Sequence, residues 1–154
     1  MKTIFKIMVV LMLVMGIATW IGAAATRFSR PEDAIKYRKS VMVIIATHFG
    51  SMGAMVKGVQ PYDSNSFAEN AATVETMSAL PWQAFLVAGS DRGDTTMNSK
   101  VLKDPDAFKK VAQQFQQATG GLRTAAEGNS LEAVKSPFGA VAASCKACHS
   151  RYRK

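Results

Sequence analysis

Cysteine is scarce in this 154-residue chain, and the usual signs of β-strands are almost absent from it. Its two cysteines are too few for a disulfide-dense scaffold. No turn dipeptide stands between alternating apolar runs, so no β-hairpin is predicted. Eleven glycines and five prolines, without a repeat, exclude a collagen-like or low-complexity chain. With 48% hydrophobic and 19% charged residues, the composition fits one globular domain.

Acidic residues are also in the minority. Nineteen Lys and Arg against 11 Asp and Glu give a formal net charge of +8. The positive residues are scattered, and their one short cluster is Arg151, Arg153 and Lys154. This pattern argues against a nucleic acid partner. It favours an acidic protein partner or an anionic cofactor, although a plain solvated surface also explains it.

Residues 1–25 have the pattern of a secretory signal peptide. Lys2 and Lys6 give a basic start, an uncharged apolar run follows, and Ala23 and Ala25 supply the small residues that precede a cleavage site. The alternative is an uncleaved membrane anchor, because the uncharged stretch is about as long as a spanning helix. Both alternatives place the domain over residues 26–154 beyond the membrane, which in a bacterium is the periplasm.

Helical signals are plentiful in the rest of the chain. Four amphipathic helices with mostly short connections predict an all-α antiparallel four-helix bundle. Gly120-Gly121 is expected to bend or fray the third helix. Pro137 is expected to kink the fourth helix or to mark its start. The predicted helices run from Pro31 to about Lys57, over 65–79, from Asp104-Pro105 onward, and over about 130–152.

The first predicted helix has one narrow stripe with a single charge on it. Arg38 is that charge, and a cation on a buried stripe calls for an anion nearby. The alternative is an arginine that extends to solvent at the end of the bundle. The stripe follows steps of three and four residues: Ile35, Arg38, Met42, Ile45, Phe49, Met52 and Val56.

A long connection from about Pro81 to Lys103 separates the second and third helices. About twenty residues without clear structure is unusual in a compact domain and indicates a functional or binding loop. Trp82 and Phe85 stand at its start and are too large to leave in water without a reason.

The chemistry of the sequence is concentrated in Cys145-Lys146-Ala147-Cys148-His149. C-x-x-C-H is the attachment sequence of haem c, in which two thiols form thioethers and the imidazole binds the iron. On a helix, Cys145, Cys148 and His149 share one side. A thiol–disulfide redox motif is usually found beside a βαβ unit, and the sequence shows no such pattern. A structural zinc site needs four ligands, and the chain has only one other histidine, His48, so this alternative is also weak. We therefore predict one covalent haem c with His149 as an axial ligand of the iron.

The position of this motif on the last of four helices resembles the cytochrome c′ family, the class II cytochromes c. The resemblance covers about residues 27–154 and includes Pro31-Glu32-Asp33-Ala34, Tyr37-Arg38, His48-Phe49-Gly50, Pro61-Tyr62-Asp63, Leu80-Pro81-Trp82 and Ser144 through His149. It implies the four-helix bundle and a periplasmic protein, often a homodimer formed through the first two helices. Val43, Ile44 and Met55 lie off the main stripe and are expected to mark such a surface.

The resemblance also assigns roles to residues around the haem. It implies Arg38 beside the haem propionates, Arg153 close to the axial histidine, and Asp94 in a loop that contacts the haem edge. Trp82 and Phe85 look like aromatic packing near the haem, whereas His48 is expected at the surface or behind the ligands. Leu102 stands where relatives carry a tryptophan.

Met42 corresponds to the family position that lies over the iron. A thioether that binds there gives a six-coordinate electron carrier, and one that only packs there leaves a five-coordinate iron open to nitric oxide or carbon monoxide. The sequence predicts electron transfer, with gas binding as the alternative. Because no nucleophile–base pair is apparent, it does not predict an enzyme.

Overall fold

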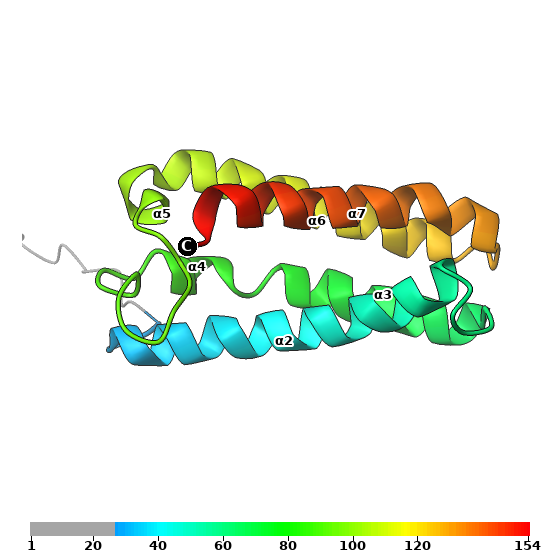
Figure 1. Cartoon of the computed structure of the whole chain (residues 1–154), viewed down its shortest axis with the longest axis horizontal. Coiled ribbons are helices and arrows are strands. Elements are labelled where there is room, and N and C mark those ends of the chain that lie inside the picture. The colour runs from blue at the N-terminus through cyan, green and yellow to red at the C-terminus, as the bar shows by residue number, and fades with distance from the viewer. Residues whose placement is uncertain (1–26) are drawn as a thin grey trace, which may run out of the picture.

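A computed structural model describes residues 27–154 of the chain, so the predicted leader over residues 1–25 lies outside the described part. Four long helices run alternately in opposite directions as a bundle (Figure 1), which confirms the predicted fold class. They are α2 (Pro31–Val56), α3 (Ser64–Ser78), α6 (Pro105–Ala126) and α7 (Leu131–Tyr152).

The starts of the helices follow from local chemistry. Pro31 opens α2, where its missing N–H costs nothing, and two acidic residues follow it in the first turn. The side chains of Asp63, Asp104 and Ser130 accept hydrogen bonds from the free backbone N–H groups of α3, α6 and α7. These caps place three of the four helix starts within about one residue of their predicted positions.

The structure corrects part of three expectations about local structure. The connection between α3 and α6 is not without structure, because it contains the one-turn helices α4 (Trp82–Phe85) and α5 (Lys100–Lys103). Helix α6 passes through Gly120-Gly121 without fraying, and a bend there stays a prediction. Helix α7 begins at Leu131, so Pro137 lies inside the helix and does not mark its start, and a kink at Pro137 stays a prediction. Packing on neighbouring helices outweighs the local preference of these residues.

The helices do not all pack against each other equally. Helix α2 packs mainly on α3, α3 packs also on α6, and α6 packs on α7, whereas α2 and α7 have little direct contact. The stripe predicted on α2 faces the interior, with Ile35, Arg38, Ile45 and Met52 buried. The bundle core is completed by Phe67, Val74, Phe115, Leu122, Val134 and Val141.

A second, smaller cluster closes the end of the bundle where α7 ends. We call it the end cluster: Met97, Val101, Phe108 and Tyr152, with the half-buried Trp82, Phe85, Leu86, Leu102, Val111 and Cys148 packed against it. Trp82 stacks near Phe85, with ring centroids 6.1 Å apart, and meets Phe108 edge-on at 5.9 Å. Trp82 and Phe85 therefore pack with other aromatic residues in the cluster that Cys148 also contacts, and their place near the haem stays a prediction.

The outer side of α2 exposes apolar residues. Val43 is 63% exposed and Ile44 38% exposed, as expected for a contact surface, but Met55 is buried in the bundle core, so its assignment to that surface was wrong. By length and composition alone, α2 could also cross a membrane, but its buried residues pack within the bundle.

Candidate functional site

Helix α7 presents two free thiols and an imidazole within five residues. Cys145 and Cys148 are half-buried and unpaired, and His149 is exposed next to them. Burial raises the pKa of the Cys145 thiol, and burial together with the neighbouring Cys145 raises the pKa of Cys148 to about 11. Both sulfurs therefore stay protonated near neutral pH. The intervening Lys146 and Ala147 are exposed, as the helical spacing predicts.

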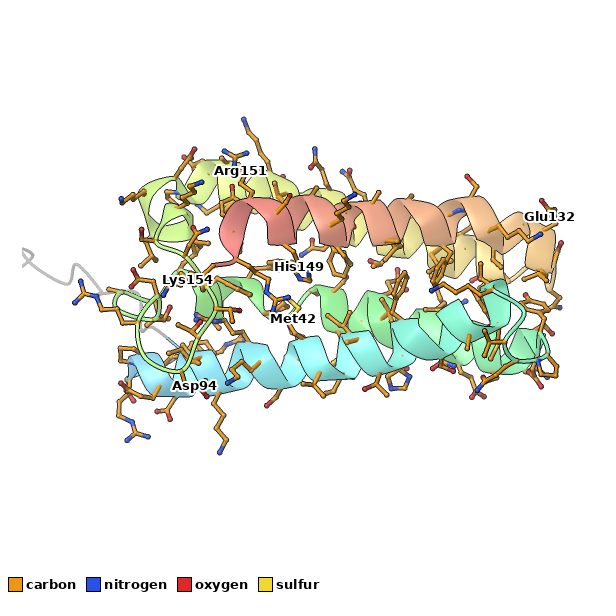
Figure 2. The ribbon with its side chains drawn as sticks, viewed as in Figure 1. Met42, Asp94, Glu132, His149, Arg151 and Lys154 are labelled. Atoms are coloured by element: carbon orange, nitrogen blue, oxygen red, sulfur yellow. The ribbon has the colours of Figure 1, made fainter. Side chains whose placement is uncertain are left out.

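The imidazole of His149 faces a methionine on another helix. Figure 2 shows the side chains of Met42, from α2, and His149, from α7, pointing toward each other in the space between the two helices. Partial burial and the charge of Arg153 both lower the pKa of His149, which favours the neutral imidazole that binds a metal. The two side chains predicted to lie on opposite faces of the iron thus come from the two helices that have little contact with each other.

Arg38 lies one turn before Met42 and is 3% exposed. Its guanidinium donates to the Ala84 carbonyl at 2.9 Å, to Ser90 Oγ at 2.9 Å and to Thr95 Oγ1 at 2.8 Å, and it lies 4.9 Å from the Phe85 ring centroid. Burial lowers its pKa to about 10, although nearby Asp91 acts in the opposite direction. The sequence predicted an anionic partner for Arg38, yet the hydrogen bonds described for it all go to neutral oxygens.

Asp94 lies in the loop between α4 and α5, on the α2 side of the bundle (Figure 2). Its carboxylate pairs with Lys39 Nζ at 2.6 Å, and its side chain is 93% exposed. The loop thus contacts α2, and the haem-edge contact that the resemblance implies for Asp94 stays a prediction.

Arg153 follows α7 directly, and its backbone N–H donates to the His149 carbonyl at 3.1 Å. Arg153 also forms an isolated β-bridge with Met97, which no sequence signal indicated. The arginine is thus held within one helical turn of His149, although its side chain is exposed.

The second histidine takes no part in this arrangement. His48 lies on α2, and its Nδ1 is 2.7 Å from Asn70 Oδ1 on α3. It is half-buried, as expected for a residue outside the iron's ligands. Within residues 27–154, no group of three His, Cys, Asp or Glu side chains is arranged to hold a separate metal ion.

Comparison with known proteins decides the family. The family model described as Cytochrome C′ matches residues 33–153. This chain belongs to the cytochrome c′ family. Curated relatives include cytochrome c′ from Alcaligenes xylosoxydans xylosoxydans, 43% identical over 83% of this chain and 98% of the relative, and cytochrome c′ from Rubrivivax gelatinosus, 37% identical over 83% and 99%.

Solved structures of cytochromes c′ have the same fold. Cytochrome c prime from Shewanella frigidimarina superposes with a TM-score of 0.80 at 38% identity, covering 83% of this chain and 99% of that one. A ferrous variant of the Alcaligenes xylosoxidans protein with bound NO superposes with a TM-score of 0.77 at 41% identity, covering 83% and 98%. A carbon monoxide-bound variant of the same protein superposes equally well, at 42% identity.

As a cytochrome c′, the chain carries one covalent haem c with its iron, and the residues of this structure fit that group. Two unpaired thiols lie one helical turn apart beside an imidazole, which is the donor set that haem c requires. A buried guanidinium without a carboxylate contact suits a cofactor that has anionic propionates. The Tyr152 hydroxyl is buried without a partner in the end cluster, next to Cys148. The three observations are independent of one another.

Sequence reasoning missed the polar residues of the long loop. Ser90 and Thr95 accept hydrogen bonds from Arg38, and Asn98 contacts the end of α7. Small polar residues in a loop carry no periodic signal, so only the fold reveals that they meet these helices.

Proposed function

We propose that this cytochrome c′ binds nitric oxide or carbon monoxide at the face of its haem iron opposite His149. The support comes from the solved structures of close fold and 41–42% identity that hold NO and CO. The stripe of α2 on this side is apolar from Met42 onward, through Ile45 and Phe49, which suits an uncharged diatomic ligand. Bound haem supplies a one-electron couple and an iron that coordinates such gases.

In this proposal Cys145 and Cys148 hold the haem. Each S–H adds across one vinyl group, with sulfur bonding to one carbon and hydrogen to the other, so no oxidant is consumed. His149 binds the iron from the α7 side. The intact protein should weigh one haem more than the chain, and the denatured, reduced protein should show a thioether-linked haem spectrum. Cys145→Ala and Cys148→Ala should each leave one vinyl group unreacted, and a protein without added mass would contradict the proposal.

We infer that Arg38, Arg153 and Asp94 lie around the haem in this arrangement. We infer that the buried Arg38 charge faces the propionates, since its other contacts described here are neutral. The support for Arg153 is its position one turn from His149, and for Asp94 its place on the loop that Arg38 holds.

A second candidate function is electron transfer by a six-coordinate haem. The orientation of Met42 toward His149 favours it, because thioether sulfur beside ferrous or ferric haem iron is a good axial ligand. In that case a gas binds only after the sulfur leaves the iron. The redox partner would be an acidic protein, given the positive charge of the chain.

One pair of measurements separates the two candidates. The ferric spin state and the rate of carbon monoxide binding to the ferrous protein are compared between the unmutated protein and Met42→Leu. If gas binding is the function, the unmutated protein is high-spin and binds carbon monoxide readily. If Met42 binds the iron, the unmutated protein is low-spin and slow, and Met42→Leu makes it high-spin and fast.

Met52→Leu is the matched control for that experiment. Met52 is fully buried on the same stripe of α2, ten residues further along, in the bundle core. Both substitutions conserve volume and should cost less than about 1.5 kcal/mol of stability. A spin change in Met52→Leu as large as in Met42→Leu would show that repacking, and not the residue over the iron, is responsible.

We further propose that the protein is exported to the periplasm, and that it acts as a carrier or binding protein and not as an enzyme. We also propose that it forms a homodimer through the outer side of α2. The exposed Val43 and Ile44 support the dimer, together with the groove of about 940 Å³ that they line with loop residues 89 and 92–94. Sedimentation of the protein, alone and with Val43→Glu, tests it: a monomer before substitution would contradict the dimer.

A further inference from the structure

The end of α7 is held by one asparagine of the long loop. The backbone N–H of Asn98 donates to the Tyr152 carbonyl at 3.0 Å. Its side-chain Nδ2 donates to the carbonyls of Arg151 at 3.1 Å and Arg153 at 3.3 Å. The last carbonyls of a helix have no partner within the helix, so this contact satisfies groups that water would otherwise bind.

The side-chain oxygen of Asn98 makes a separate contact, to α5. Its Oδ1 accepts a hydrogen bond from the Lys100 N–H at 2.9 Å, at the start of α5. The side chain thus joins α5 and the end of α7 through separate atoms. Because the oxygen and the nitrogen have different partners, substitutions can remove one contact and keep the other.

Neighbouring residues strengthen the same attachment. The Lys154 N–H donates to the Thr96 carbonyl at 2.8 Å, and its Nζ donates to the Asp91 carbonyl at 3.0 Å. Met97 forms the β-bridge with Arg153 and is buried in the end cluster. Residues 96–98 of the loop therefore lie along residues 152–154, so the attachment consists of several contacts.

The same segment reaches α2. Thr95 Oγ1 accepts from Arg38 Nη2 at 2.8 Å and from the Met97 N–H at 3.1 Å. Arg38 is buried on α2 one turn before Met42, and the contacts with Asn98 begin two residues after His149. Four residues, Thr95–Asn98, thus connect the helix of Met42 to the helix of His149.

We propose that the segment Thr95–Asn98 is a tie that sets the separation of α2 and α7 at the haem, and that Asn98 and Thr95 are positioning residues for the two faces of the iron. Helices α2 and α7 have little direct contact, so their separation at this end depends on what bridges them. The inference rests on the proposed position of the haem between Met42 and His149. It holds whether Met42 binds the iron or leaves it open.

The test compares Asn98→Ala with Asn98→Asp in the haem-loaded protein. Alanine removes every side-chain contact, whereas aspartate keeps an acceptor for the Lys100 N–H but cannot donate to the α7 carbonyls. Three properties are measured: the stretching frequency of the bond between iron and His149 in the ferrous protein, the carbon monoxide association rate, and the melting temperature. Both variants should shift the frequency and change the association rate several-fold. Recovery of the unmutated values in Asn98→Asp would overturn the proposal.

Ser130→Ala is the matched control. Ser130 caps α7 at its other end, where its Oγ accepts from the Ala133 N–H at 3.4 Å. Figure 2 labels Glu132 in the first turn of this end of the helix. This variant should lower the melting temperature and leave the frequency and association rate unchanged. If it alters them as much as the Asn98 variants do, the tie has only a general stabilising role and the proposal is wrong.

Thr95→Val provides an independent test at the α2 end and covers the case in which the Asn98 variants do not fold. It keeps the shape of the side chain and removes the oxygen that Arg38 and the Met97 N–H share. The association rate should change in the same direction as in the Asn98 variants, and an unchanged rate would overturn the proposal. Haem content, measured by mass on the unmutated protein, separately tests the proposed function: absence of haem would refute that function and the tie together.

Discussion

Arg38 and Ser90 are joined through both the side chain and the backbone of the serine, across 52 positions of sequence. One guanidinium nitrogen donates to Ser90 Oγ at 2.9 Å and the other to the Ser90 carbonyl. Both residues are buried, so water cannot replace these contacts. The pair fixes the long loop to α2 beside the proposed haem site.

Ser90→Ala is therefore expected to lower the free energy of unfolding by about 1–2 kcal/mol, because a hydrogen bond to a charged, buried group is lost while other acceptors remain. Chemical denaturation of the haem-loaded protein measures this. Ser40→Ala, an exposed position on α2, serves as the control and should change little. Equal effects of the two substitutions would contradict the role of Ser90.

Substitution by alanine should have different effects on stability at two glycines of α2. A Cβ at Gly50 meets nothing within 4 Å, so Gly50→Ala should stabilise the helix by about 0.5–1 kcal/mol. A Cβ at Gly53 would lie 3.3 Å from Cζ of Phe138, whose ring stacks on Phe49 with centroids 4.3 Å apart. Since the stacked ring has little freedom to move, Gly53→Ala should lose that gain or destabilise the protein. Thermal denaturation of both variants checks the difference.

Tyr62 should affect stability at alkaline pH. Its hydroxyl is buried without a hydrogen-bond partner, and burial raises its pKa above the ordinary value. The unfolded chain therefore loses this proton at lower pH than the folded protein does, so the stability contribution is full below about pH 10 and declines as pH rises further. Tyr62→Phe should be neutral or slightly stabilising at pH 7 and increasingly stabilising above pH 10, relative to the unmutated protein. Denaturation at both pH values tests this, and a difference independent of pH would contradict it.

Asp94→Asn separates the two roles considered for this residue. The ion pair with Lys39 is exposed, so its loss should leave the free energy of unfolding nearly unchanged. If the carboxylate also lies at the haem edge, the reduction potential of the haem rises when the negative charge is removed. Asp106→Asn, which removes an exposed partner of Lys109 on α6, is the control and should leave the potential unchanged. An unchanged potential in Asp94→Asn would exclude the haem-edge role.

The sequence predicts the parts of this protein that depend on periodicity or on short-range chemistry. The stripe from Ile35 to Val56 and the cap at Asp104 are visible because helices repeat and caps have fixed spacing. The family resemblance, carried by residues such as Tyr37 and Cys145, is confirmed by the family model over residues 33–153.

The remaining features depend on how distant segments meet. Met55 lies off the stripe of α2, yet it is buried in the bundle core, which the period of one helix cannot reveal. The partners of Arg38 are backbone and hydroxyl oxygens of a loop, and Asn98 binds carbonyls at the end of α7. Carbonyl groups belong to every residue, so no residue type marks them in advance.

The stack of Phe49 on Phe138 and the tie together limit how far apart α2 and α7 can lie. The stack joins α2 to α7 at one point along their length, and Thr95–Asn98 joins them near the end of α7. On α2 these two contacts lie on either side of Met42, at Phe49 and at Arg38, so the spacing of α2 and α7 between them changes only if a helix bends. The two contacts therefore set the distance between α2 and α7 at Met42. We expect this distance to stay nearly constant when Met42 is replaced by a side chain of different size.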